Sequence, residues 1–226
     1  MTPDALHARL TALAEPGYRD FMAKLLPTVD RDHILGVRAP FLRNLAGELK
    51  KTGAADDFMG RLPHAVHEEN LVHAYLLGLE TDAVKALAQV DAFLLHVHNW
   101  AVCDAIKPLA FSRHHSAVAP RVRTWLDSPL PYAQRYGFVA LLCHFLGEHF
   151  QEEHLLWAAN HPAGDYYVDM ARAWYLSMAL VDHWEAGLPL IARRQLDPWT
   201  HRKAIQKAVE SRQISPERKA ILKSYR

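Results

Sequence analysis

The apolar residues of this chain recur with the period of an α-helix along almost its whole length. In residues 38–51, Phe41, Leu45 and Leu49 are spaced four positions apart, and charged residues fall between them. No stretch alternates apolar and polar residues over enough positions to indicate a β-strand. Because this spacing places apolar side chains on one side of a helix, the pattern predicts an all-α fold.

Short breaks rich in proline and glycine separate one amphipathic segment from the next. Thr81-Asp82, Ser128 and Asp197 are residue types that cap helix N-termini, and Pro129 and Pro198 suit a first turn. The predicted helices span about 4–14, 17–26, 38–51, 66–79, 81–96, 99–111, 115–127, 130–147, 149–159, 165–181, 183–193, 198–210 and 215–225.

From Phe58 onward, pairs of predicted helices recur roughly every 35–40 residues, a spacing typical of HEAT or armadillo-like repeats. The prediction depends on spacing alone, because the units share almost no sequence identity. An irregular helical bundle is the alternative. Stacked pairs would form an α-solenoid, a single domain over residues 1–226 whose concave face is wide enough for an extended polymer.

The composition excludes several classes of protein. With 50% hydrophobic and 23% charged residues, the chain is too apolar for intrinsic disorder, and no apolar run is long enough to cross a membrane. The first four residues lack the basic and then apolar pattern of a secretion signal. Cys103 and Cys143 both lie in apolar surroundings, so we expect buried free thiols in a reducing cytoplasm.

The charges are unevenly distributed along the chain. Residues 193–226 carry ten Lys and Arg against three Asp and Glu, a balance of +7, whereas residues 1–192 carry sixteen against twenty-two, a balance of −6. A basic end on a mildly acidic chain indicates contact with a polyanion. The alternative is an ordinary solvated helix surface.

The predicted helix 99–111 places a tryptophan one turn before an aspartate. At about 100° per residue, Trp100, Asp104, Lys107 and Phe111 fall on one side of the helix. An indole and a carboxylate on the side away from the core form a candidate site for a cationic ligand. Alternatively, Trp100 packs against a neighbouring helix while Asp104 and Lys107 form an exposed ion pair. The expected core stripe of this helix is Val102, Ile106 and Leu109.

Two further side chains stand out on predicted helices. Arg135 lies within the apolar stripe of helix 130–147, so its guanidinium either reaches toward solvent or is held where it meets a specific anion. Trp174 lies on helix 165–181, which is apolar almost all round and is therefore expected to be central. Trp174 belongs either to the core or to a site.

Several segments together resemble the HEAT-like repeat DNA alkylation repair proteins, the AlkD-type DNA glycosylases. The resemblance follows the order of the chain and covers nearly all of it. The segments are NWAVCD at 99–104, QRYGFVALL at 134–142 and YYVDMARAWYLS at 166–177, supported by LGVRAPFLR at 35–43 and WTHRKAIQKAVES at 199–211.

The resemblance implies an α-solenoid that holds double-stranded DNA in its concave face. The implied activity is excision of purines made cationic by alkylation at N3 or N7. It involves no metal ion and no organic cofactor, and the 15 histidines fit no metal motif. We expect a monomer in the bacterial cytosol or nucleoid, with no membrane partner.

The resemblance assigns the catalytic site to Asp104, Trp100 and Trp174, with Arg135 as an adjacent phosphate contact. These residue types suit the chemistry. A cationic purine leaves as a neutral base, so positive charge moves to the sugar, where an ionised carboxylate stabilises it. Indole rings can flank the cationic lesion or its sugar.

Basic residues are the expected contacts to the DNA backbone. Besides Arg135 and Lys107, these are Arg202, Lys203 and Lys207 in the basic C-terminal end. Lys203 and Lys207 are one helical turn apart, so both could meet the same strand of phosphates. Such contacts give salt-sensitive affinity without choice of sequence.

Two other functions remain open from the sequence. The first is a protein with the same fold that binds DNA by its shape and removes no base. The second is a helical-repeat scaffold for another protein, in which case the basic end has no role in DNA binding. Release of methylated bases separates the glycosylase from both.

Overall fold

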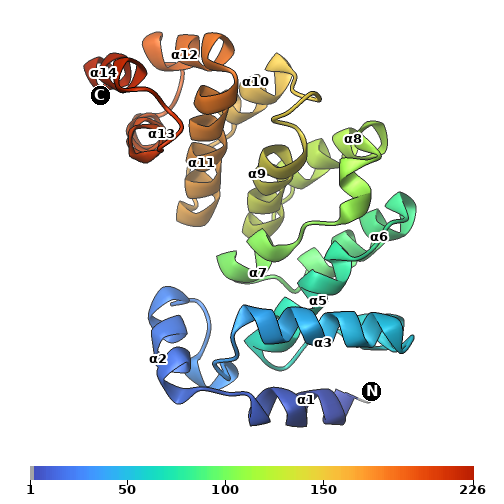
Figure 1. Cartoon of the computed structure of the whole chain (residues 1–226). Helices are drawn as coiled ribbons and strands as arrows, with labels where there is room; N and C mark the ends of the chain where they lie inside the picture. The colour runs from blue at the N-terminus through green and yellow to red at the C-terminus, as the bar shows by residue number, and fades with distance from the viewer. Residues whose placement is uncertain (1–2) are drawn as a thin grey trace. The chain divides into compact units, whose positions relative to one another are not determined.

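The computed structural model describes residues 3–226, and within this range it is all-α, with no β-strand (Figure 1). The all-α prediction is confirmed. The backbone forms two compact units, one ending at His114 and one running from His115 to Arg226. Residues 1 and 2, which carry part of the argument against a secretion signal, lie outside the described residues. The expectation of one domain over residues 1–226 stays a prediction.

The described part of the first unit contains seven α-helices and two short 3-10 helices. The elements are α1 (Pro3–Ala12), α2 (Pro16–Leu25), η1 (Arg31–His33), α3 (Ala39–Lys51), α4 (Ala55–Met59), α5 (His67–Gly78), α6 (Ala83–Leu94), α7 (Trp100–Ala105) and η2 (Leu109–Ser112).

The second unit contains seven α-helices. They are α8 (His115–Leu126), α9 (Pro131–His144), α10 (Glu152–Asn160), α11 (Tyr166–Asp182), α12 (Trp184–Ala192), α13 (Pro198–Glu210) and α14 (Pro216–Ser224).

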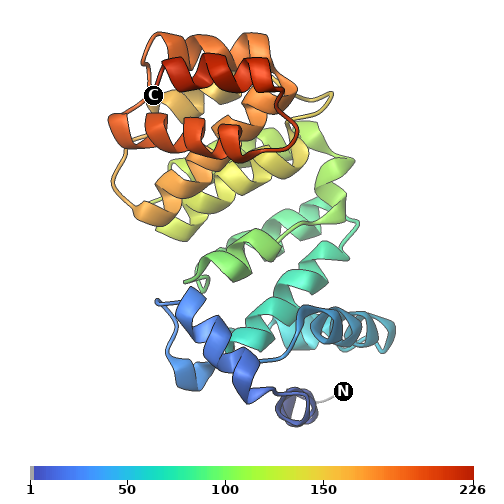
Figure 2. The ribbon, with the colours of Figure 1, turned by 60° about the vertical axis from the view of Figure 1, so that its left-hand side comes forward.

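Alternate helices pack side by side within each unit. In the first unit α5 packs against both α3 and α7, and in the second α11 packs against both α9 and α13 (Figures 1 and 2). The intervening helices α8, α10 and α12 form a second layer in the second unit. Two layers built from alternate helices are the packing of a helical-repeat solenoid, so that prediction is confirmed.

The segment 99–111 differs most from its prediction. Helix α7 ends at Ala105, Ile106 is extended with φ −74° and ψ 101°, and η2 begins only at Leu109. Pro108 explains the break, because it has no amide hydrogen to donate and disfavours helical backbone at the residue before it. Phe111 is therefore buried and Leu109 is 45% exposed, the reverse of the prediction.

Other departures are smaller. Asp82 and Asp197 cap α6 and α13 as predicted, but Ser128 does not cap α9, whose N-cap is Leu130. Cys103 is buried, whereas Cys143 is only half-buried. In α3 the buried stripe contains Leu42, Leu45, Ala46 and Leu49, and Phe41 is exposed. No helix within residues 3–226 combines the length and apolarity needed to cross a membrane.

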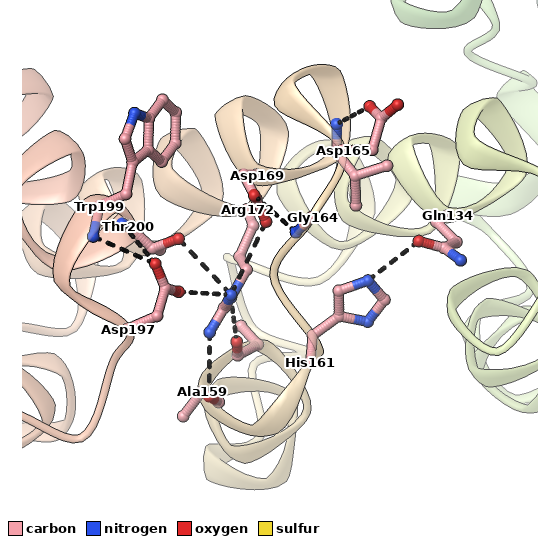
Figure 3. Close-up of polar contacts among 12 residues, drawn as sticks. Gln134, Ala159, His161, Gly164, Asp165, Asp169, Arg172, Asp197, Trp199 and Thr200 are labelled. Carbon is pink, nitrogen blue, oxygen red and sulfur yellow. Dashed lines mark hydrogen bonds and ion pairs between the residues drawn. The ribbon is translucent and has the colours of Figure 1, made fainter.

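A buried arginine fixes the start of α13. Arg172 on α11 is 1% exposed, and its guanidinium donates to the carbonyl oxygens of Ala158 and Ala159 and, at 2.8 Å, to Asp197 (Figure 3). The other carboxylate oxygen of Asp197 accepts hydrogen bonds from the first amides of α13, those of Trp199 and Thr200. One ion pair therefore joins α11, the end of α10 and the N-terminus of α13.

The surroundings of this ion pair favour its charged state. Burial lowers the pKa of Arg172, but the charges of Asp197 and Asp169 oppose that shift. Burial also disfavours an ionised Asp197, yet hydrogen bonds from Thr200 and the charge of Arg172 keep its pKa below the ordinary value. Asp197 thus serves both as helix cap and as counter-ion.

Replacing Arg172 with leucine should strongly destabilise the second unit. The substitution leaves the Asp197 carboxylate and two backbone carbonyls without their donor, and breaking a buried ion pair in this way costs about 3–5 kcal/mol. The control is Arg123→Leu, which removes an exposed ion pair to Asp127 in the same unit and should cost under about 1 kcal/mol. Equal losses for the two variants, measured by denaturant unfolding, would contradict this assignment.

Histidines are part of the core of the first unit. The rings of His64 and His73 are joined by a hydrogen bond of 2.8 Å, and His73 stacks on Phe93 with ring centroids 3.9 Å apart. Burial lowers the pKa of His64 to about 4 and that of His73 to about 2. Burial likewise lowers the pKa of His67 to about 4. All three are therefore neutral at pH 7.

Mild acid should weaken the fold. Below pH 6.5 these histidines take up protons in the unfolded chain but stay neutral in the folded one, so stability is lost as the pH falls from about 6.5 toward 4. Each fully buried ring should contribute roughly 1–2 kcal/mol of that loss by pH 5. His73→Leu should make the slope of unfolding free energy against pH shallower, and His33→Gln, at an exposed site, should not. A wild-type stability that is flat from pH 7 to 5 would rule out this effect.

Candidate functional site

Helix α7 is short because both of its ends are fixed. Asn99, 1% exposed, has extended backbone, and its side-chain oxygen accepts the amide hydrogen of Val102 at 3.0 Å. Val102 and Cys103 are buried. The six residues of α7 therefore hold Trp100 and Asp104 one turn apart on the side away from this buried face.

Trp100 is anchored to the end of α2. Its indole nitrogen donates to the carbonyl oxygen of Leu25 at 3.0 Å, and its ring packs against the buried side chains of Leu26, Val29 and Ile34. This contact uses the polar edge of the indole and leaves the side chain half-buried. The ring orientation is consequently set before any ligand arrives.

Asp104 lines a hollow of ≈ 490 Å³ in the first unit. The hollow is bordered by α3, α5, α7 and the segment that follows α7. Asp104 is half-buried there, and Lys107 is exposed at the border. No ion pair joins Asp104 to Lys107 in the part of the chain that the structure describes. The lining residues are Arg43, Ala46, Tyr75, Gly78, Leu79, Ala101, Asp104, Ala105 and Lys107.

Sequence reasoning assigned no role to two of the lining residues, Arg43 and Tyr75. The guanidinium carbon of Arg43 lies 4.9 Å from the centroid of the Tyr75 ring. Burial raises the pKa of Tyr75, so its hydroxyl keeps its proton at neutral pH. Arg43 ends the segment LGVRAPFLR, but the resemblance assigned it no role, and only the packing of α3 against α5 brings it to Tyr75.

A buried carboxylate holds α3 and α5 in register. Glu68, at the start of α5 and 1% exposed, accepts hydrogen bonds from the amides of Leu35, Gly36 and Val37 just before α3. Gly36 has a φ of +88°, and a Cβ there would lie 2.6 Å from the backbone of Arg19. The sequence at this turn therefore fixes where α3 begins, and with it the position of Arg43.

The second unit places Trp174 on its central helix. Most residues of α11 are buried, as predicted, but Trp174 is half-buried, as are Met170 and Met178 on the same helix. These side chains form the more accessible edge of α11. Trp174 is therefore partly open to a ligand, whereas its neighbours Ala173 and Tyr175 belong to the core.

Three of the cations predicted to contact the DNA backbone, Arg135, Lys203 and Lys207, lie close enough to interact electrostatically. Arg135 is 5% exposed and donates to the carbonyl oxygen of Tyr167 at 2.6 Å. Burial lowers the pKa of Lys207, Glu210 opposes this, and the charges of Lys203 and Arg135 lower it further. An anion bound among these three cations would relieve their repulsion.

The cations of α13 differ in exposure, since Arg202 is exposed whereas Lys203 and Lys207 are half-buried. Lys203 donates to Gln206 at 3.0 Å while its ammonium lies 5.7 Å from the centroid of the Trp199 ring. Sequence reasoning did not single out the aromatic rings beside them. Tyr166 contacts both Tyr167 and Trp199, with ring centroids 5.2 and 6.0 Å apart. The position of these aromatic residues in the first turns of α11 and α13 is the sequence feature that could have predicted the cluster.

Within residues 3–226, no group of three or more His, Cys, Asp or Glu side chains could hold a metal ion. Several histidines instead pack against aromatic rings, as His154 does with Phe145 and His183 with Phe150.

Comparison with known proteins identifies the family. The family model described as DNA alkylation repair enzyme matches residues 6–208. No curated protein matches the chain. The matched region includes α7 with Asp104 and Trp100, α9 with Arg135, α11 with Trp174, and the cations of α13. The chain belongs to the DNA alkylation repair enzyme family.

Proposed function

We propose that this protein is a DNA glycosylase that removes cationic N3- or N7-alkylated purines from double-stranded DNA. The observation that carries the proposal is the carboxylate of Asp104, which lines an open hollow one helical turn from an anchored Trp100. Membership of an alkylation repair family supports DNA as the substrate. We expect the protein to act as a monomer in the cytoplasm.

The proposed reaction is hydrolysis of the bond between the purine and its sugar. The bond breaks with its electron pair going to the purine, which leaves as a neutral base. The sugar becomes oxocarbenium-like at its anomeric carbon, and the Asp104 carboxylate stabilises that charge and orients a water molecule. Water adds to the carbon, its proton passes to the carboxylate or to solvent, and an abasic site remains. Because the base is already cationic, the reaction needs neither a cofactor nor a metal ion.

The two tryptophans and the cations have separate roles in this proposal. Trp100, with its indole nitrogen bonded to Leu25, offers a ring of fixed orientation to the cationic nucleotide. Trp174, on the accessible edge of α11, is assigned to the same nucleotide by the family resemblance. The backbone phosphates are assigned to Lys107, Arg135, Arg202, Lys203 and Lys207.

Asp104→Asn should abolish base release while leaving DNA binding largely intact. The amide keeps the shape of the side chain but removes the charge that stabilises the sugar cation, so we expect the single-turnover rate to fall by on the order of 100-fold or more. The assay measures free methylated base released from a methylated duplex. Asp32→Asn, at an acid whose side chain is 87% exposed, serves as the control. A wild-type protein that binds DNA but yields no abasic product would instead favour the non-catalytic DNA-binding function.

Neutralising two lysines of α13 should weaken DNA binding in a salt-dependent way. For Lys203→Gln combined with Lys207→Gln, the slope of log affinity against log salt should become less steep by about 1 for each lost phosphate contact. Lys219→Gln combined with Lys223→Gln removes the same two charges from α14 and should leave the slope nearly unchanged. Equal effects at α13 and α14 would show that net charge matters and position does not.

A further inference from the structure

Two arginines of the first unit lie over tyrosine rings in similar geometry. The guanidinium carbon of Arg38 is 4.7 Å from the centroid of the Tyr18 ring, and that of Arg43 is 4.9 Å from the centroid of Tyr75. In both cases the ring limits the freedom of a side chain that carries five hydrogen-bond donors. In both pairs, therefore, a tyrosine ring holds the guanidinium in place.

The two arginines differ in whether a carboxylate of the protein neutralises the guanidinium charge. Arg38 makes three hydrogen bonds to the carboxylate of Glu15, at 2.8, 3.1 and 2.9 Å, so its charge is matched within the protein. Arg43 has no ion pair with any residue of the described range 3–226. An arginine held in place without a counter-ion is ready to bind an external anion.

The surroundings of Arg43 point to one kind of anion. Arg43 borders the same hollow as Asp104, and Lys107, which also makes no ion pair in the described part of the chain, lies on its border too. Two cations thus lie at the hollow around one carboxylate. In a DNA strand each sugar is flanked by two phosphates, and a sugar at Asp104 would bring these anions toward the two cations.

We propose that Arg43, held over the ring of Tyr75, binds a backbone phosphate adjacent to the nucleotide whose sugar faces Asp104. The inference rests on the proposed function, since it takes DNA as the occupant of the hollow. Arg43 is a binding residue in this scheme, and Tyr75 is a positioning residue that acts through it. The guanidinium can give two parallel hydrogen bonds to one phosphate, which a lysine cannot.

The experiment compares Arg43→Gln with Arg38→Gln in the full chain. Binding is measured against salt concentration on a duplex containing a tetrahydrofuran abasic analogue, and thermal unfolding checks that each variant folds. Arg43→Gln should weaken binding about fivefold to tenfold at moderate salt and make the log–log salt slope less steep by about 1. Arg38→Gln should change neither quantity, because Glu15 already neutralises Arg38.

Three further variants separate binding from a merely structural role. Arg43→Lys keeps the charge, so the salt slope should stay near that of the wild type while the affinity falls. Tyr75→Phe keeps the ring beneath the guanidinium and should bind like the wild type. Tyr75→Leu removes the ring and should weaken binding about threefold, with little change of slope because Arg43 is still charged. If the contact between Arg43 and Tyr75 only stabilised the fold, the affinity would not depend on the guanidinium and the ring while the salt slope followed the charge.

The outcomes distinguish this inference from the proposed function. If Arg43→Gln folds and binds with wild-type affinity and slope while Asp104→Asn loses base release, the Arg43 assignment is wrong and the glycosylase proposal stands. If Arg43→Gln does not fold, the Arg43→Lys and Tyr75→Leu results decide, and wild-type affinity in both overturns the assignment. A wild-type protein without measurable affinity for the duplex overturns both proposals.

Discussion

The proposed site depends on a helix of six residues whose two ends are fixed by the local sequence. Asn99 caps its first turn and is itself buried, while Pro108 prevents the chain from continuing as a helix. Between these ends, Trp100 and Asp104 have little freedom to change their relative position. In the reaction proposed above, the Asp104 carboxylate would benefit from this rigidity, because electrostatic stabilisation is strongest when the charge does not have to move into place.

Two buried charged residues extend the same principle to the surrounding helices. Glu68 accepts three backbone amides ahead of α3, and Arg172 donates to two backbone carbonyls at the end of α10. Each satisfies polar groups that would otherwise be buried without partners, and each sets the register of neighbouring helices. Glu68 thereby places Arg43 relative to Tyr75, and Arg172 places the cationic helix α13 through Asp197. Residues far from the proposed site thus determine where the side chains assigned to it lie.

The helices and most of their limits could be predicted because local chemistry determines them. Asp197 followed by a proline marks the start of α13, and the spacing of apolar residues on α11 indicates a central helix. At Pro108, by contrast, extrapolating the helical period placed Phe111 on the wrong side, because a proline interrupts the backbone there. Arg43 and Tyr75 lie on different helices and meet only through tertiary packing, so no local pattern could pair them. The placement of Asp104 one turn from Trp100 could be predicted because one short helix carries both.

Identifying what happens to the alkyl group tests the central claim most directly. A duplex containing 7-methylguanine with an isotopically labelled methyl group is incubated with the wild-type protein, and the label is followed in free base, DNA and protein. We expect the label in released 7-methylguanine, together with an equal amount of alkali-sensitive abasic strand. Label transferred to the protein or released without its purine, with guanine left intact in the strand, would contradict cleavage of the bond between base and sugar.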